Sequence, residues 1–229
     1  MKTRQITVTQ LRLYSSDTIS LATISTPVIA DRIKDQFKFR SYSPKTGNQG
    51  PALVFEMGAF IDGDSTFAIR LLAVGSRRLE LQIEARSEVA DRFHSELAAF
   101  LVDLLPGKID LTAPTHKSET TVSTTDLELN LDALVNAEYK AFLEQVVGPT
   151  LAQPEHKVRL SPVQVGVLVS WTPNEGTSPQ VRLVERPLRL EVRQGTRPEE
   201  RIFFVSYPGD SQTHDKILVA LEEVFRAKQ

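Results

Sequence analysis

The stretch Leu79-Glu-Leu-Gln-Ile-Glu-Ala-Arg-Ser87 alternates apolar and polar residues and ends on a serine. A stretch 124 residues later has a similar strand-like pattern and also ends on a serine: Phe203-Phe-Val-Ser-Tyr-Pro-Gly-Asp-Ser211. An alternation with a period of two is typical of a half-buried strand. Each serine is followed by apolar residues at helical spacing, and serine is a favoured helix N-cap. The two stretches therefore predict the same strand-to-helix unit twice, with Ser87 and Ser211 as caps.

The apolar stripes of the two predicted helices keep the same offset as the serines. We expect six residues of these stripes to be buried: Phe93, Leu97, Leu101, Ile217, Leu221 and Phe225. Truncation of a buried leucine such as Leu221 to alanine is expected to cost about 2 to 5 kcal/mol.

Further matches lie upstream of both units. Residues 51–60 resemble residues 162–171, and Asp62-Gly63-Asp64 predicts a hairpin turn because glycine accepts a positive φ. Each half then reads as a strand, a helix, a three-stranded antiparallel meander and a second helix. The elements expected in the first half are 6–13, 27–39, 53–61, 66–74, 78–85 and 89–104. Those expected in the second half are 121–129, 131–147, 163–171, 181–192, 202–207 and 213–227.

These patterns predict an internally duplicated α+β fold, with two strand-helix-meander-helix halves about a pseudo-twofold axis. The predicted repeats are residues 1–110 and 111–229, either as separate domains or as one continuous domain, with the segment 108–120 as linker. The pattern resembles duplicated saddle and helix-grip architectures at the level of fold, and it carries over no functional residue.

Composition excludes several classes of protein. The chain has 27 basic and 29 acidic side chains, a formal charge of −2 and no cysteine. Disulfide frameworks, thiolate metal sites and cysteine nucleophiles are thereby excluded. A chain without cysteine suits a reducing compartment, so we expect a cytoplasmic protein. The best candidate for a membrane span is too short to cross a bilayer, so we expect no membrane partner.

Catalytic and metal-binding motifs are absent from the sequence. The histidines do not match H-E-x-x-H, and there is no phosphate-binding loop or nucleophile elbow. His94 and His214 are interpreted as solvated helix-surface residues. Ser211, His214 and Asp215 supply the residue types of a catalytic triad within one helical turn, where a capping serine is the simpler interpretation. We therefore predict no catalytic residue, no metal and no cofactor; a ligand pocket under the helices has only the fold analogy behind it.

One surface segment, residues 31–45, mixes basic and aromatic side chains in a way that suits phosphate contact and base stacking. Its candidate binding residues are Arg32, Lys34, Lys38, Phe39, Arg40, Tyr42 and Lys45. The alternative interpretation is an amphipathic helix that buries its aromatic side and keeps its lysine and arginine heads in water.

Two functional hypotheses follow. The first is a non-enzymatic binding or assembly module, a small subunit that docks a protein partner or a second copy of itself. The second is association with nucleic acid through the basic aromatic segment, since residues 1–114 carry more positive charge than residues 115–229.

Overall fold

A computed structural model gives the fold of the chain and describes residues 1–14, 19–47, 50–105, 111, 114–129, 131–147, 164–169 and 186–226. Among these residues, nine strands form one antiparallel sheet in the order β2-β3-β4-β5-β1-β6-β9-β8-β7. The strands are β1 (Lys2–Leu13), β2 (Ser41–Gly47), β3 (Gly50–Asp62), β4 (Ser65–Gly75), β5 (Arg78–Ile83), β6 (His116–Asp126), β7 (Gln164–Val169), β8 (Arg186–Val192) and β9 (Ile202–Tyr207).

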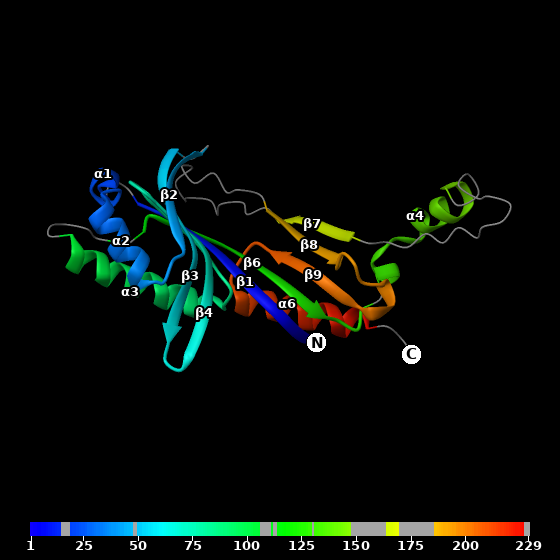
Figure 1. The fold of residues 1–229 in the computed structure, drawn as a ribbon. Coiled ribbons are helices and arrows are strands. Elements are labelled where there is room, and N and C mark those ends of the chain that lie inside the picture. The colour runs from blue at the N-terminus through cyan, green and yellow to red at the C-terminus, as the bar shows by residue number, and fades with distance from the viewer. Residues whose placement is uncertain are drawn as a thin grey trace, which may run out of the picture. The chain divides into compact units, whose positions relative to one another are not determined.

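Helical elements connect these strands (Figure 1). They are α1 (Leu21–Ile24), α2 (Pro27–Gln36), α3 (Ser87–Leu104), the 3₁₀ turn η1 (Leu131–Leu134), α4 (Ala137–Phe142), the π turn η2 (Leu143–Val147), the 3₁₀ turn η3 (Pro198–Glu200) and α6 (Ser211–Phe225). The predicted single helix over 131–147 is thus three short pieces.

The predicted duplicated α+β fold is wrong, because the strands of both halves belong to one large sheet. Strand β2 was not predicted at all; it pairs with β3 from Ser41↔Glu56 to Gly47↔Gly50. Its Pro44 and Lys45 do not fit a central-strand pattern, but both are residue types that sheets accept on an edge strand. The predicted linker is also wrong over residues 116–120, which are the start of β6, whereas 108–110 and 112–113 lie outside the described residues.

The contacts divide the chain into two compact units. Unit 1 comprises Met1–Arg4, Ser123–Pro208 and His214–Gln229, and unit 2 comprises Gln5–Val122 and Gly209–Thr213. The predicted boundary between residues 110 and 111 adjoins residues 106–110, which lie outside the described residues.

Unit 2 has a core between one face of its strands and the helices α2 and α3. Phe93, Leu97 and Leu101 of α3 are fully buried there, as the sequence predicted. Phe93 meets Phe37 edge-on at 5.0 Å between ring centroids and Phe60 at 5.4 Å. Burial of these large apolar groups is the main driving force for the unit.

Two glycines determine the local backbone of β3 and of the turn that follows it. The backbone of Gly58 lies so close to the Phe39 ring that an added Cβ would sit 2.5 Å from its Cδ1 and Cε1 atoms, so only glycine fits there. The hairpin turn after β3 forms as predicted, with Gly63 at φ +59° and Asp62 paired with Ser65.

Unit 1 has a smaller core, in which α6 packs on strands β8 and β9 through Leu218, Leu190, Phe203 and Val205. The expectation that Ile217, Leu221 and Phe225 are buried is wrong, because all three are only partly covered. Helix α6 is turned so that His214, Leu218 and Glu222 face inward instead. Leu221 and Phe225 of the predicted stripe pack against the edge of this core, and Ile217 is half-buried.

Candidate functional site

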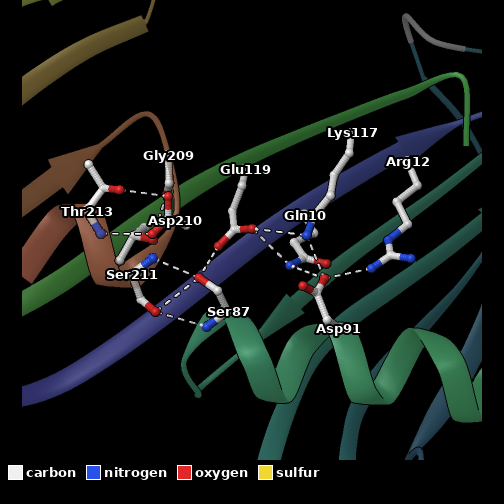
Figure 2. A network of polar contacts seen from close by, with 11 residues as sticks. Gln10, Arg12, Ser87, Asp91, Lys117, Glu119, Gly209, Asp210, Ser211 and Thr213 are labelled. Carbon is white, nitrogen blue, oxygen red and sulfur yellow. Dashed lines mark hydrogen bonds and ion pairs between the residues drawn. The ribbon is translucent and has the colours of Figure 1, made fainter.

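A cluster of polar side chains lies in unit 2, where β1 and β6 pass the first turns of α3 and α6 (Figure 2). We call it the polar cluster; its members are Gln10, Arg12, Ser87, Asp91, Lys117, Glu119 and Ser211. The periodicities of the elements bring these residues together. Alternate positions on a strand share a face, as Gln10 and Arg12 do, and positions four apart share one side of a helix, as Ser87 and Asp91 do.

Asp91 is the hub at the solvent side of the polar cluster. Its Oδ1 accepts hydrogen bonds from Gln10 Nε2 at 3.0 Å, Arg12 Nη2 at 2.7 Å and Lys117 Nζ at 2.6 Å. Burial acts to raise the pKa of Asp91, but the hydrogen bonds from Lys117 and Gln10 and the charges of Lys117 and Arg12 outweigh it, so the pKa lies below its ordinary value. Asp91 is therefore a stable anion.

Glu119 is the inner carboxylate. Its Oε2 accepts a hydrogen bond from Gln10 Nε2 at 2.9 Å, and its Oε1 accepts one from the hydroxyl of Ser87. The side chain of Gln10 thus bridges Asp91 and Glu119, and Gln10 itself is fully buried. Burial raises the pKa of Glu119, although the hydrogen bond from Ser87 and the charge of Lys117 partly offset it.

Ser87 and Ser211 join the first turns of α3 and α6. The backbone N–H of Ser211 donates to Ser87 Oγ at 2.7 Å, and that of Ser87 donates to Ser211 Oγ at 3.1 Å. The first N–H groups of a helix have no partner inside it, so each serine satisfies a group of the other helix. This exchange is a correction to the sequence prediction, in which each serine caps its own helix. The residue before Ser87 at the start of α3 is Arg86, and Asp210 caps α6 by accepting from Thr213 N at 2.8 Å.

His94 lies next to the polar cluster on α3 and is 3% exposed, so the interpretation of a solvated histidine is wrong. Among the described residues, neither ring nitrogen has a hydrogen-bond partner. Burial and the charge of Arg12 lower its pKa to about 3, so the ring is neutral at ordinary pH. The neutral ring packs beside Phe93, with 6.0 Å between the ring centroids.

A second buried group lies in unit 1 and brings a serine, a histidine and an aspartate together. Ser123 Oγ is 3.2 Å from His214 Nε2, and His214 Nδ1 is 3.5 Å from Asp215 Oδ1. Ser123 also lies 2.8 Å from the hydroxyl of Thr125. His214 is not solvated, contrary to the sequence interpretation: it is 1% exposed and Ser123 is 2% exposed. Ser123 and His214 thus place their polar atoms inside unit 1 within hydrogen-bond distance of each other, as buried polar groups require.

The polar cluster balances its charges internally, because Arg12 and Lys117 face Asp91 and Glu119. Among the described residues, no group of three or more histidine, aspartate or glutamate side chains is arranged to hold a metal ion. Ser87 Oγ already serves Glu119 and the Ser211 backbone, both in the interior. The arrangement joins two strands to two helix starts, and we assign it a structural role.

The predicted basic aromatic segment is spread over two elements, because α2 ends at Gln36 and β2 begins at Ser41. The exposed basic residues are Arg32, Lys38, Arg40 and Lys45, and Lys34 is partly covered. Lys45 Nζ forms an ion pair with Glu56 at 2.5 Å.

The aromatic residues of the segment face the core. Phe39 is 3% exposed and packs on Phe55, and Tyr42 is half-buried against the same ring. Stacking on bases through Phe39 would require it to leave the core. The nucleic-acid hypothesis therefore depends on the basic side chains.

One apolar stripe along the side of α6 is only partly covered, although two of its residues, Ile217 and Leu221, were predicted to be buried. Ile217, Ala220, Leu221 and Val224 follow one another at helical spacing along the side of the helix; we call them the α6 flank. Val224 is 71% exposed, Ala220 is exposed, and Ile217 and Leu221 are half-buried. The stripe of apolar residues was visible in the sequence, but its exposure was not.

No protein-family profile matches the chain, and no curated protein is significantly similar to it. Within the described parts of the chain, no helix is long and apolar enough to cross a membrane.

Proposed function

We propose that the protein is a non-enzymatic binding or assembly module that docks a protein partner through the α6 flank. The observation that carries the proposal is the orientation of α6, which buries His214 and Glu222 and leaves the apolar flank at the surface. A continuous apolar stripe on a surface helix is the pattern of helix-mediated protein recognition.

The energetics support an interface on this side of the helix. A helix normally turns its most apolar stripe to the core, because burial contributes about 25 cal/mol per Å² of apolar surface. In α6 part of this stabilising free energy is not gained, because Ile217, Ala220 and Val224 are only partly covered or exposed. A partner that covers these residues would recover it, and the exposed side chains would form the centre of the contact. We place this module in the cytoplasm, since a chain without cysteine suits a reducing compartment.

Site-specific photo-cross-linking in cells tests the proposal. A benzophenone amino acid replaces Val224, and the control carries it at Val28 of α2, which is equally exposed at 72%. We expect position 224 to give a discrete adduct with a second polypeptide and position 28 to give none. Equal adducts from both positions, or none from either, would overturn the proposed docking surface.

The second proposal is association with single-stranded nucleic acid, favoured by the exposure of Arg32, Lys38 and Arg40. Each neutralised phosphate releases counterions, so the slope of log K against log salt is about −0.7 per contact. We expect the double change Lys38→Ala and Arg40→Ala to make that slope less negative by about 1.4 if both residues contact phosphate. A slope that stays the same, measured by fluorescence anisotropy with a labelled oligonucleotide, would exclude these two contacts.

A further inference from the structure

The α6 flank has charged residues on one border. Ile217, Ala220, Leu221 and Val224 form the apolar stripe, and Lys216 and Glu223 are exposed side chains along the same edge of it. Glu223 follows Lys216 by seven positions, which is about two helical turns. The two side chains therefore do not pair within one helix, because such pairs form three or four residues apart.

The order of these residues is self-complementary about Ala220. When two α6 helices lie antiparallel with a twofold axis close to Ala220, that alanine meets its own copy. Ile217 of one helix then meets Val224 of the other, and Lys216 meets Glu223. The twofold axis places the Lys216 and Glu223 border of both helices on the same side of the contact. Two Lys216–Glu223 ion pairs therefore form between the helices, one at each end of that border.

The residue sizes fit such a crossing. The methyl side chain of Ala220 at the centre allows the helix axes to approach, and the larger Ile217 and Val224 fill the space on either side. In a parallel arrangement the twofold axis would run along the helices and place the two charged borders on opposite sides of the contact. Lys216 and Glu223 would then have no partner across it, so complementary charge favours the antiparallel orientation.

We infer that the partner docked on the α6 flank is a second copy of this chain, bound through an antiparallel α6–α6 contact with twofold symmetry. The inference rests on the proposed docking function and names its partner. One copy of the flank contacts the same flank on the other chain, so the contact closes on itself as a dimer and does not propagate. The contact is small, and it gives a reversible dimer.

Sedimentation velocity on the full chain, from about 1 µM to about 1 mM, tests the dimer and its geometry. Val224→Glu is expected to weaken dimerisation by about tenfold or more, because it brings a charge into the apolar centre. Val28→Glu, at an equally exposed valine of α2, is the matched control and is expected to dimerise like the unaltered chain. Circular dichroism and thermal unfolding establish that both variants are folded.

Charge exchange tests the antiparallel register. Lys216→Glu and Glu223→Lys, each made alone, are expected to weaken the dimer by about three- to tenfold. The two changes combined in one chain restore both contacts with reversed polarity, so the dissociation constant is expected to return to within about twofold of the original value. Failure of the combined variant to recover would overturn the antiparallel contact.

The outcomes separate this inference from the function on which it rests. A chain that stays monomeric while position 224 cross-links to a different protein would overturn the dimer and leave the docking function in place. A monomer that gives no specific cross-link at position 224 would overturn both. A dimer that Val224→Glu does not weaken would overturn the α6 contact.

Discussion

Helices α3 and α6 have similar sequence patterns, but they pack differently. In α3 the apolar stripe of Phe93, Leu97 and Leu101 is the buried face. In α6 the corresponding residues pack only at the edge of the core and are partly covered, and the buried face contains His214, Leu218 and Glu222. Periodicity identifies a helix, whereas its rotation depends on what lies beneath it. For α6 that includes the backbone N–H of Glu128, which donates to Glu222 Oε1 at 2.8 Å.

The largest expected difference between α3 and α6 is in the free energy of unfolding that is lost when a leucine is truncated to alanine. Leu97→Ala in α3 and Leu218→Ala in α6 each remove a fully buried side chain, so each is expected to cost about 2 to 5 kcal/mol. Leu221→Ala removes a half-buried one and is expected to cost about 1 kcal/mol, less than the sequence pattern predicted. Urea unfolding measures the three values. A cost for Leu221→Ala equal to that of Leu218→Ala would show that Leu221 belongs to the core.

The sequence predicted most helices and strands, but it did not predict their assembly. Leu79–Ile83 and residues 202–207 are strands, and the serines after them begin helices, because local alternation and spacing define such elements. The single sheet depends on pairings between distant segments, which local patterns do not encode. Strand β2 escaped prediction because Pro44 and Lys45 interrupt its alternation.

The polar cluster was only partly predictable. Gln10 and Arg12 continue the inward phase of β1 that begins at Val8, so a period of two could have placed them on the core face. Their partner Asp91 was matched only with Asp215, because sequence spacing gives no contact across the fold. Glu119 fell within the predicted linker. The burial of Glu119 follows from its position on β6. The start of this strand was not predicted, because the residues before it resemble a turn.

The next prediction concerns the change in stability with pH that is caused by His94 of α3. Its folded pKa of about 3 lies below the unfolded value of about 6.5, so between these values only the unfolded chain binds the proton. Stability must therefore fall as the pH falls through this window, by about 1.4 kcal/mol per pH unit from this one group. The groups that bear on His94 are Asp91 on its own helix, Arg12 on β1 and Lys117 on β6.

His94→Leu removes both the titration and the two ring nitrogens that lack partners. At pH 7 we expect it to raise stability by about 1 kcal/mol. At pH 5 the advantage over the unaltered chain should grow by about 2 kcal/mol. Thermal unfolding of both proteins at pH 5, 6 and 7 measures the difference. A difference that does not change with pH would show that His94 takes up a proton as readily in the folded chain as in the unfolded chain.

The serine exchange between α3 and α6 comes next in size. Ser87→Ala and Ser211→Ala each leave a backbone N–H of the other helix without its acceptor, at an expected cost of about 1 to 2 kcal/mol. The double variant should cost less than the sum, because the two hydroxyls, 3.0 Å apart, act together. A double-mutant cycle in urea measures the coupling. Strict additivity would mean that the two helix starts are independent.

The smallest expected effect compares Asp91 with Asp215, which hold corresponding positions in the two helices. Asp91→Asn removes a charge that accepts from Gln10, Arg12 and Lys117, but the carboxylate is 46% exposed, so we expect a cost of about 1 kcal/mol. Asp215→Asn is the comparison in α6, where the carboxylate lies 3.5 Å from Nδ1 of the buried His214.

Acid should abolish the cost of Asp91→Asn. The folded pKa of Asp91 lies below its unfolded value of about 3.9, so the anion stabilises the fold above that pH and the contribution is lost as the pH falls through the folded pKa. The difference between Asp91→Asn and the unaltered chain should therefore be constant from pH 5 to pH 7 and shrink below about pH 4. Guanidinium chloride screens such pairs, so urea is the denaturant to use. A cost near zero for Asp91→Asn at pH 7 would mean that the three donors add nothing at Asp91.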